Sequence, residues 1–90
     1  MAQIITQEIV ASRVDTIIRK QVGSDTSLSP ETHLQDDLGM DSLELVELGV
    51  TLEKEFHVAV PDAEVRRCVT LSDVTHLILR AEPEEEVRSA

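Results

Sequence analysis

The chain has 90 residues, of which 41% are hydrophobic, and its 18 acidic and 8 basic side chains give a formal net charge of -10. This length suits one small domain, and the charge argues against a nucleic-acid partner, because contact with phosphates requires clustered Lys and Arg. Residues 24–64 hold eleven acidic side chains and one basic one, Lys54, so this segment should attract basic protein surfaces.

Residues 4 to about 22 are predicted to form the first helix. Seven apolar side chains recur there at helical spacing, with charged residues on the opposite side. They are Ile5, Ile9, Val10, Val14, Ile17, Ile18 and Val22. Gly23 follows and is the expected C-terminal stop, because glycine readily adopts the left-handed conformation that ends many helices.

A loop is predicted over residues 24–40, where Ser, Asp, Pro and Gly oppose regular structure. It is long for so small a domain, and loops of this length are usually functional or disordered. Leu28, Leu34 and Leu38 are spaced so that they can hold the loop against a core. We therefore predict an ordered loop.

The second helix is predicted from about residue 42 to residue 56. Asp41 is a favourable N-cap, and Glu44 stands three residues further on, which resembles a capping box. One face of this helix should point to the core: Leu45, Leu48, Gly49, Leu52 and Phe56. A smaller apolar strip lies beside the acidic side chains: Leu43, Val46 and Val50.

The last part of the chain should hold a linker and two more helices. The apolar run 58–60 could be a strand, but no partner strand is predicted, so we interpret it as a packed linker. A short helix is predicted from Asp62 to about Arg67, with Pro61 at its entry. The last helix is predicted from Thr70 to about Ala81, and Pro83 ends it. Its inward residues are Leu71, Val74, Leu77 and Ile78.

These elements predict an all-α fold: a small four-helix bundle with three main helices, one short helix, and a long loop between the first two helices. Residues 1–82 would form the domain. Residues 83–90 are acidic and lack core residues, so we expect them to be a disordered tail.

The remaining reactive side chains do not form a recognisable catalytic or metal site. Cys68 is alone, so no internal disulfide is possible, and we interpret it as a small core residue. His33, His57 and His76 lack metal-ligand spacing, and no nucleophile–base pair stands out. No run is long and apolar enough to span a membrane, and no signal peptide is recognisable, so we expect a cytoplasmic location.

Ser42 lies where the long loop enters the second helix. Unpaired backbone N–H groups and the positive end of the helix dipole meet there, so a phosphate ester on this side chain would be well placed. A serine at a helix start is often only a cap. Here Asp41 is the better cap, which leaves Ser42 without a structural role.

The run from Leu38 to Leu43, Leu-Gly-Met-Asp-Ser-Leu, resembles the attachment motif of the acyl carrier protein family. The likeness covers roughly residues 4–80 and needs no gap from residue 38 to residue 80. It continues through three further stretches: Glu47, Leu48 and Leu52 to Phe56; Val60-Pro61-Asp62; and Thr70-Leu71-Ser72-Asp73-Val74.

The resemblance implies that a separate phosphopantetheinyl transferase attaches 4'-phosphopantetheine from coenzyme A to Ser42. The arm would then carry acyl groups as thioesters. The chain would be a monomer and would catalyse no reaction itself. Its partners would be acyl-transfer, condensing and modifying enzymes with basic docking surfaces. Six residues occupy the positions of the family's recognition helix: Asp41, Leu43, Val46, Glu47, Val50 and Glu53.

Several questions stay open at this level. Arg66 and Arg67 stand where the family is commonly acidic, and Lys54 interrupts the acids, so the pathway could be fatty acid synthesis or a specialised lipid or polyketide route. The cargo could also be an aminoacyl group, or the chain could be an interaction module without an arm. Gly49 either allows close helix packing or opens an acyl cavity. That cavity would be lined by Leu45, Gly49, Leu52, Phe56, Val60 and Leu77.

Overall fold

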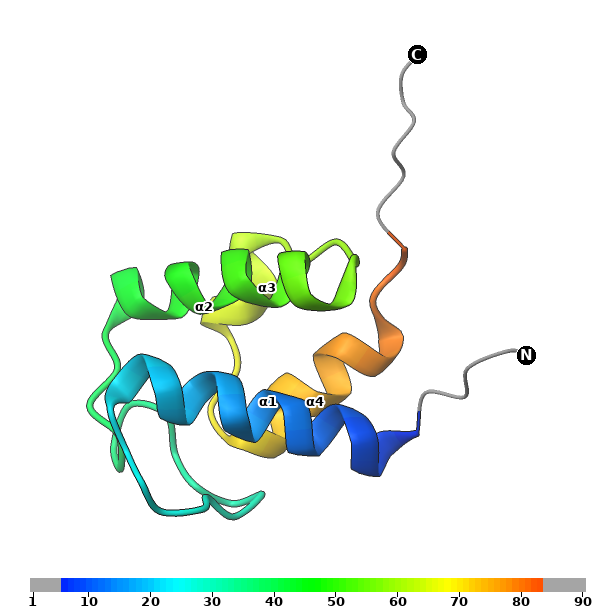
Figure 1. Ribbon diagram of the computed structural model, residues 1–90. Helices are drawn as coiled ribbons and strands as arrows, with labels where there is room; N and C mark the ends of the chain where they lie inside the picture. Colours follow the sequence, from blue (N-terminus) through cyan, green and yellow to red (C-terminus); the bar gives the residue numbers. More distant parts are fainter. Residues whose placement is uncertain (1–5, 84–90) are drawn as a thin grey trace.

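The computed structural model describes residues 6–83 and contains four helices (Figure 1): α1 (Gln7–Val22), α2 (Ser42–Phe56), α3 (Asp62–Arg66) and α4 (Leu71–Arg80). Within these residues there is no β-strand, only two isolated bridges. The predicted all-α fold with three main helices and one short helix is therefore confirmed.

The helices pack around α1, which contacts both α2 and α4. In Figure 1 both partners run in the opposite direction to α1, and α3 lies behind α2. α3 packs mainly on α2 and also touches α4. This arrangement places the start of α2 beside the end of α1.

The core is almost entirely aliphatic. Each helix contributes buried side chains to it, the loop and the linker add three more, and the segment between α3 and α4 adds Cys68. The buried hydrophobic residues are Val10, Val14, Ile18, Leu34, Met40, Leu45, Leu48, Leu52, Val60, Val65, Cys68, Leu71, Val74, Leu77 and Ile78. The core position expected for Cys68 is thus confirmed. Ile9, which the sequence analysis counted with the apolar set of α1, is instead 45% exposed, because at about 100° per residue it lies about 140° around the helix from the buried Val14.

Local capping determines where the helices begin and end. Thr6 caps α1 by accepting a hydrogen bond from the N–H of Ile9, so this helix begins later than the predicted residue 4. Gly23 ends α1 in the left-handed conformation, with φ of 74°. Thr70 is the N-cap of α4 rather than its first residue, and it forms a capping box with Asp73.

The long loop over residues 24–40 is ordered, as predicted. Leu34 is fully buried, and Leu28 and Leu38 pack against the core. The backbone of the loop is tied to the segment that enters α4: Leu34 donates to Val69 O at 2.9 Å, and Leu71 donates to Thr32 O at 3.0 Å. The loop therefore holds the start of α2, where Ser42 lies, in a fixed position.

The linker between α2 and α3 packs as predicted, with Val60 buried. It also pairs with the chain after α4: Val58 forms a bridge with Pro83, and Ala59 N–H donates to Glu82 O at 3.0 Å. Pro83, expected in the tail, is thus paired with the linker, although it is exposed. Residues 84–90, the rest of the expected tail, lie outside the described residues. In the described part of the chain, none of the helices combines the length and apolar character that crossing a bilayer requires.

Candidate functional site

Ser42 is the first residue of α2, and its side chain is exposed. The capping box predicted around it is present. Asp41 Oδ1 accepts a hydrogen bond from the N–H of Glu44 at 2.9 Å, and Glu44 Oε1 accepts one from the N–H of Asp41 at 3.1 Å. The Ser42 hydroxyl takes part in neither bond. It is therefore free for chemistry at a helix end whose first N–H groups favour a negatively charged substituent.

The approach to Ser42 depends on Gly39, whose φ of 71° lies in the left-handed region. No atom lies within 4 Å of a Cβ added there, so backbone strain rather than space favours glycine. After this turn Met40 is buried, and its N–H donates to Leu34 O at 3.0 Å. Met40 thus anchors the chain two residues before Ser42, which the sequence analysis did not foresee.

Acidic side chains lie along the segment of the chain that leads to Ser42. Asp36, Asp37 and Asp41 are exposed, and the first two bind His33: Asp37 Oδ2 accepts from its backbone N–H at 2.8 Å, and Asp36 Oδ2 lies 3.3 Å from its Nδ1. Among residues 6–83, no group of three or more His, Cys, Asp or Glu side chains is arranged to hold a metal ion.

The six residues expected on the recognition helix differ in their exposure. Leu43 is 66% exposed and Val50 is 45% exposed, and both are large apolar side chains on an acidic surface. Asp41 and Glu47 are also exposed, whereas Val46 is half-buried. Glu53 is half-buried too, because its carboxylate Oε2 accepts a hydrogen bond from the N–H of Val60 at 3.0 Å.

The residues expected to line an acyl cavity lie together on the inner side of α2. Leu45, Leu52, Val60 and Leu77 are buried, and Phe56 is half-buried. The space beside Gly49 is filled by α3.

A Cβ added at Gly49 would lie 3.2 Å from Val65 Cγ1 and 3.6 Å from Val60 Cγ1. This contact favours the close-packing interpretation of Gly49, and the cavity stays a prediction. Val65 comes from a different helix, so helical periodicity could not reveal the contact.

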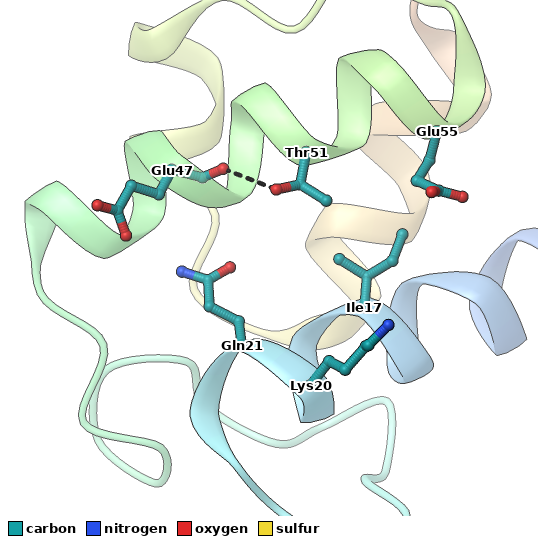
Figure 2. A pocket seen from close by; sticks show the side chains of 6 residues that line it. All are labelled: Ile17, Lys20, Gln21, Glu47, Thr51 and Glu55. Atoms are coloured by element: carbon teal, nitrogen blue, oxygen red, sulfur yellow. Dashed lines mark hydrogen bonds between the residues drawn. The ribbon is translucent and has the colours of Figure 1, made fainter.

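A groove of about 420 Å³ lies between α1 and α2 (Figure 2). Sequence reasoning missed it, because its two walls come from different helices. Its lining residues are Ile17, Lys20, Gln21, Glu47, Thr51 and Glu55. Ser42 and Thr51 are nine residues apart, which at about 3.6 residues per turn places them on opposite sides of α2. The groove therefore lies on the side of α2 away from Ser42, although Glu47, one of the six residues expected on the recognition helix, also lines it.

The other candidate nucleophile is unsuited to covalent chemistry at neutral pH. Burial raises the pKa of the Cys68 thiol to about 11, and the nearby Asp73 carboxylate adds to the effect. The thiolate is the reactive form of cysteine, so Cys68 stays protonated and inert. The three basic residues that depart from the resemblance, Lys54, Arg66 and Arg67, are all exposed.

Comparison with known proteins identifies the family. A family model described as "Phosphopantetheine attachment site" matches residues 12–78. The chain is 41% identical over 78 residues to an acyl carrier protein of Clostridium acetobutylicum, covering 86% of this chain and 100% of that protein. It is 40% identical over 74 residues to an acyl carrier protein of Thermotoga maritima, covering 81% and 91%.

A solved structure agrees with these relatives. The solution structure of the apo doublet acyl carrier protein from prodigiosin biosynthesis superposes with a TM-score of 0.71 at 28% identity. The alignment covers all of this chain and 46% of that one, so the chain spans about half of the doublet protein. The matching family model and the two relatives show that this chain belongs to the acyl carrier protein family, whose members carry a phosphopantetheine attachment site.

Proposed function

We propose that Ser42 is the residue to which 4'-phosphopantetheine is attached, and that the chain presents acyl groups to other enzymes on that arm. The observation that carries the proposal is the exposed Ser42 hydroxyl at the start of α2, beside a capping box that does not use it. When bound, the arm supplies a terminal thiol that holds acyl groups as thioesters.

The residues around Ser42 fit a phosphodiester. The first N–H groups of α2 lack partners within the helix and carry partial positive charge, which favours an anion there. Asp41 and Glu44 satisfy each other through the capping box, so the turn keeps its shape without help from the Ser42 hydroxyl. The chain's own part is thus to hold one hydroxyl in a fixed, accessible place.

The surface beside Ser42 suits transient partners with basic docking surfaces, including the phosphopantetheinyl transferase. Asp41 and Glu47 supply exposed negative charge, and Leu43 and Val50 supply exposed apolar contact. The negative charge speeds the encounter with a basic partner, while the limited number of apolar contacts lets the complex dissociate quickly. Val46 completes this docking face from a half-buried position.

The chain's role in this proposal is that of a non-catalytic, monomeric, cytoplasmic carrier in fatty acid synthesis or a related lipid or polyketide pathway. The exposed Arg66 and Arg67 on and just after α3 favour a specialised partner set, because they place positive charge near a surface that is otherwise acidic. An aminoacyl cargo would be a second form of the same carrier role.

Intact mass measurement tests the attachment directly. The protein is incubated with coenzyme A and a broad-specificity phosphopantetheinyl transferase, beside two variants, Ser42→Ala and Ser72→Ala. We expect wild type and Ser72→Ala to gain one phosphopantetheine each and Ser42→Ala to gain none. A mass gain in Ser42→Ala, or no gain in wild type with several transferases, would contradict the proposal.

A further inference from the structure

We propose that Gln21 is a positioning residue for Ser42, holding the first turn of α2 from the last turn of α1. Gln21 Nε2 donates a hydrogen bond to the backbone carbonyl oxygen of Glu44 at 2.9 Å. The side chain is half-buried in the groove between the two helices. Figure 2 shows it extending from α1 toward α2. The inference rests on the proposed function for the meaning of Ser42 as the attachment residue.

The bond from Gln21 can position Ser42 because it reaches the first turn of α2. Glu44 is the third residue of the helix, and it closes the capping box with Asp41. Ser42 lies between these two residues, inside the turn that the box defines. A capping box fixes the shape of its own turn, but it does not fix where that turn stands relative to the rest of the protein. The buried Met40 holds the chain just before the turn, and the bond from Gln21 holds the turn itself from α1.

The first turn of a helix needs such a constraint more than any later turn. Its N–H groups have no partners within the helix, and helix ends fray for this reason. Fraying would move the Ser42 hydroxyl relative to Glu47 and Val50, the exposed residues of the docking face that lie beyond the first turn. A transferase bound to that face would then meet the hydroxyl in many positions, and misplacement of a reacting group by even 1 Å slows a reaction.

The chemistry of the side chain explains why an amide suits the position. Glu44 O is an acceptor with two lone pairs, so it can accept a side-chain donor in addition to a helix bond. An amide N–H donates without adding charge to the groove, whose walls carry Lys20 on one side and Glu47 on the other. A longer cationic donor could make the same bond, whereas an apolar side chain of equal length could not.

Two variants separate donation from packing: Gln21→Met keeps the length and loses the donor, and Gln21→Lys keeps a donor. Each is tested with coenzyme A and the transferase for kcat and KM of attachment. Each is also tested for hydrogen exchange of the Glu44 and Leu45 amides, which are both bonded to Asp41. For Gln21→Met we expect kcat to fall and exchange to speed up, each by roughly five-fold, as for one lost hydrogen bond, with KM unchanged. Gln21→Lys should stay within about two-fold of wild type in both readouts, because it keeps the bond.

Arg13→Met is the matched control, because it breaks a different α1–α2 contact. Arg13 Nη2 lies 3.1 Å from Glu55 Oε1, and its guanidinium lies 5.5 Å from the ring centre of Phe56, near the far end of α2. This variant should lose stability but keep the wild-type kcat and the wild-type exchange at Glu44 and Leu45.

The outcomes that overturn the inference are distinct from failure of the proposed function. Equal slowing by Gln21→Met and Arg13→Met would mean that helix packing in general, and not Gln21, controls attachment. Wild-type kcat and exchange in Gln21→Met would overturn the inference while Ser42 remains the attachment residue. If wild type gains no phosphopantetheine, the proposed function fails. The exchange of the Glu44 and Leu45 amides then still tests Gln21 by itself: unchanged exchange in Gln21→Met would show that its hydrogen bond does not hold the first turn of α2.

Discussion

The carboxylate of Glu53 in α2 accepts a hydrogen bond from the backbone N–H of Val60, at 3.0 Å, and so ties the helix to the linker that leads into α3. The resemblance places Glu53 on the recognition helix, but this bond also makes the side chain part of the fold. A backbone N–H without a partner is costly when it is shielded from water, so the bond should contribute to stability.

We predict that Glu53→Ala lowers the free energy of unfolding by about 1–2 kcal/mol, because a hydrogen bond to a charged acceptor is lost. In a domain of this size the melting temperature should fall by roughly 4–8 °C per kcal/mol. Glu53→Gln keeps an acceptor oxygen and should lose less than half as much. Thermal unfolding of the two variants measures the difference, and equal losses would show that charge rather than the hydrogen bond matters.

Charge reversal at Glu47 should weaken docking without affecting the fold. Glu47 is exposed on α2, and charge on an interface rim acts mainly on the encounter with a partner. For Glu47→Lys we expect the KM for transferase-catalysed attachment to rise several-fold, and the rise should shrink as salt is added. Glu8→Lys makes the same change of charge in the first turn of α1 and should leave KM unchanged. A similar rise for both variants would indicate an effect of net charge alone.

Gly49 should be intolerant of a large side chain, since even an added Cβ would lie 3.2 Å from Val65 Cγ1. We predict that Gly49→Leu lowers the free energy of unfolding by about 1–3 kcal/mol, as overpacking of a core does. The loss should be smaller when Val65→Ala is also present, and urea unfolding of the double-mutant cycle measures this coupling. Additive losses would show that Gly49 and Val65 do not compete for space. If the acyl cavity exists, Gly49→Leu should also sequester long acyl chains less well.

The capping carboxylate of Asp73 should make stability depend on pH. Hydrogen bonds from the backbone N–H groups of Val69 and Thr70 lower its pKa in the folded protein. A carboxylate with a lowered pKa stabilises the fold fully above its unfolded pKa of about 3.9, and this contribution is lost as the pH falls through the folded pKa.

Asp73→Asn should therefore cost about 1 kcal/mol at pH 7, because a neutral amide oxygen accepts the backbone hydrogen bonds less strongly than a carboxylate does. This difference in stability from wild type should narrow below about pH 4. Thermal unfolding at pH 7, 5 and 3 measures it. Asp25→Asn, at an exposed loop position, should match wild type throughout. A stability difference between Asp73→Asn and wild type that stays constant from pH 7 to pH 3 would contradict the pKa argument.

Local signals in the sequence predicted the parts of the fold that depend on neighbouring residues. Asp41 and Glu44 are three residues apart, so their capping box could be recognised without knowing the fold, as could the stop at Gly23. The loop anchors Leu28 and Leu34 were also predictable, because apolar residues in a polar loop need a core to bury them.

Contacts between elements could not be predicted in this way. The bond from Gln21 to Glu44 joins residues 23 positions apart, and the contact of Gly49 with Val65 joins two helices. Periodicity identifies a face of a helix but not which neighbour covers it. Ile9 is a different case: it was counted with the apolar set of α1 but lies about 140° around the helix from the buried Val14, and it is 45% exposed.

The central claim is that the arm is attached at Ser42, and the most direct test is to locate it on protein purified from its own cells. Proteolysis and tandem mass spectrometry should find phosphopantetheine on the peptide that contains Ser42, with fragments on both sides placing the added mass on that residue. Protein that never carries the group, or carries it on another side chain such as Ser72, would contradict the account.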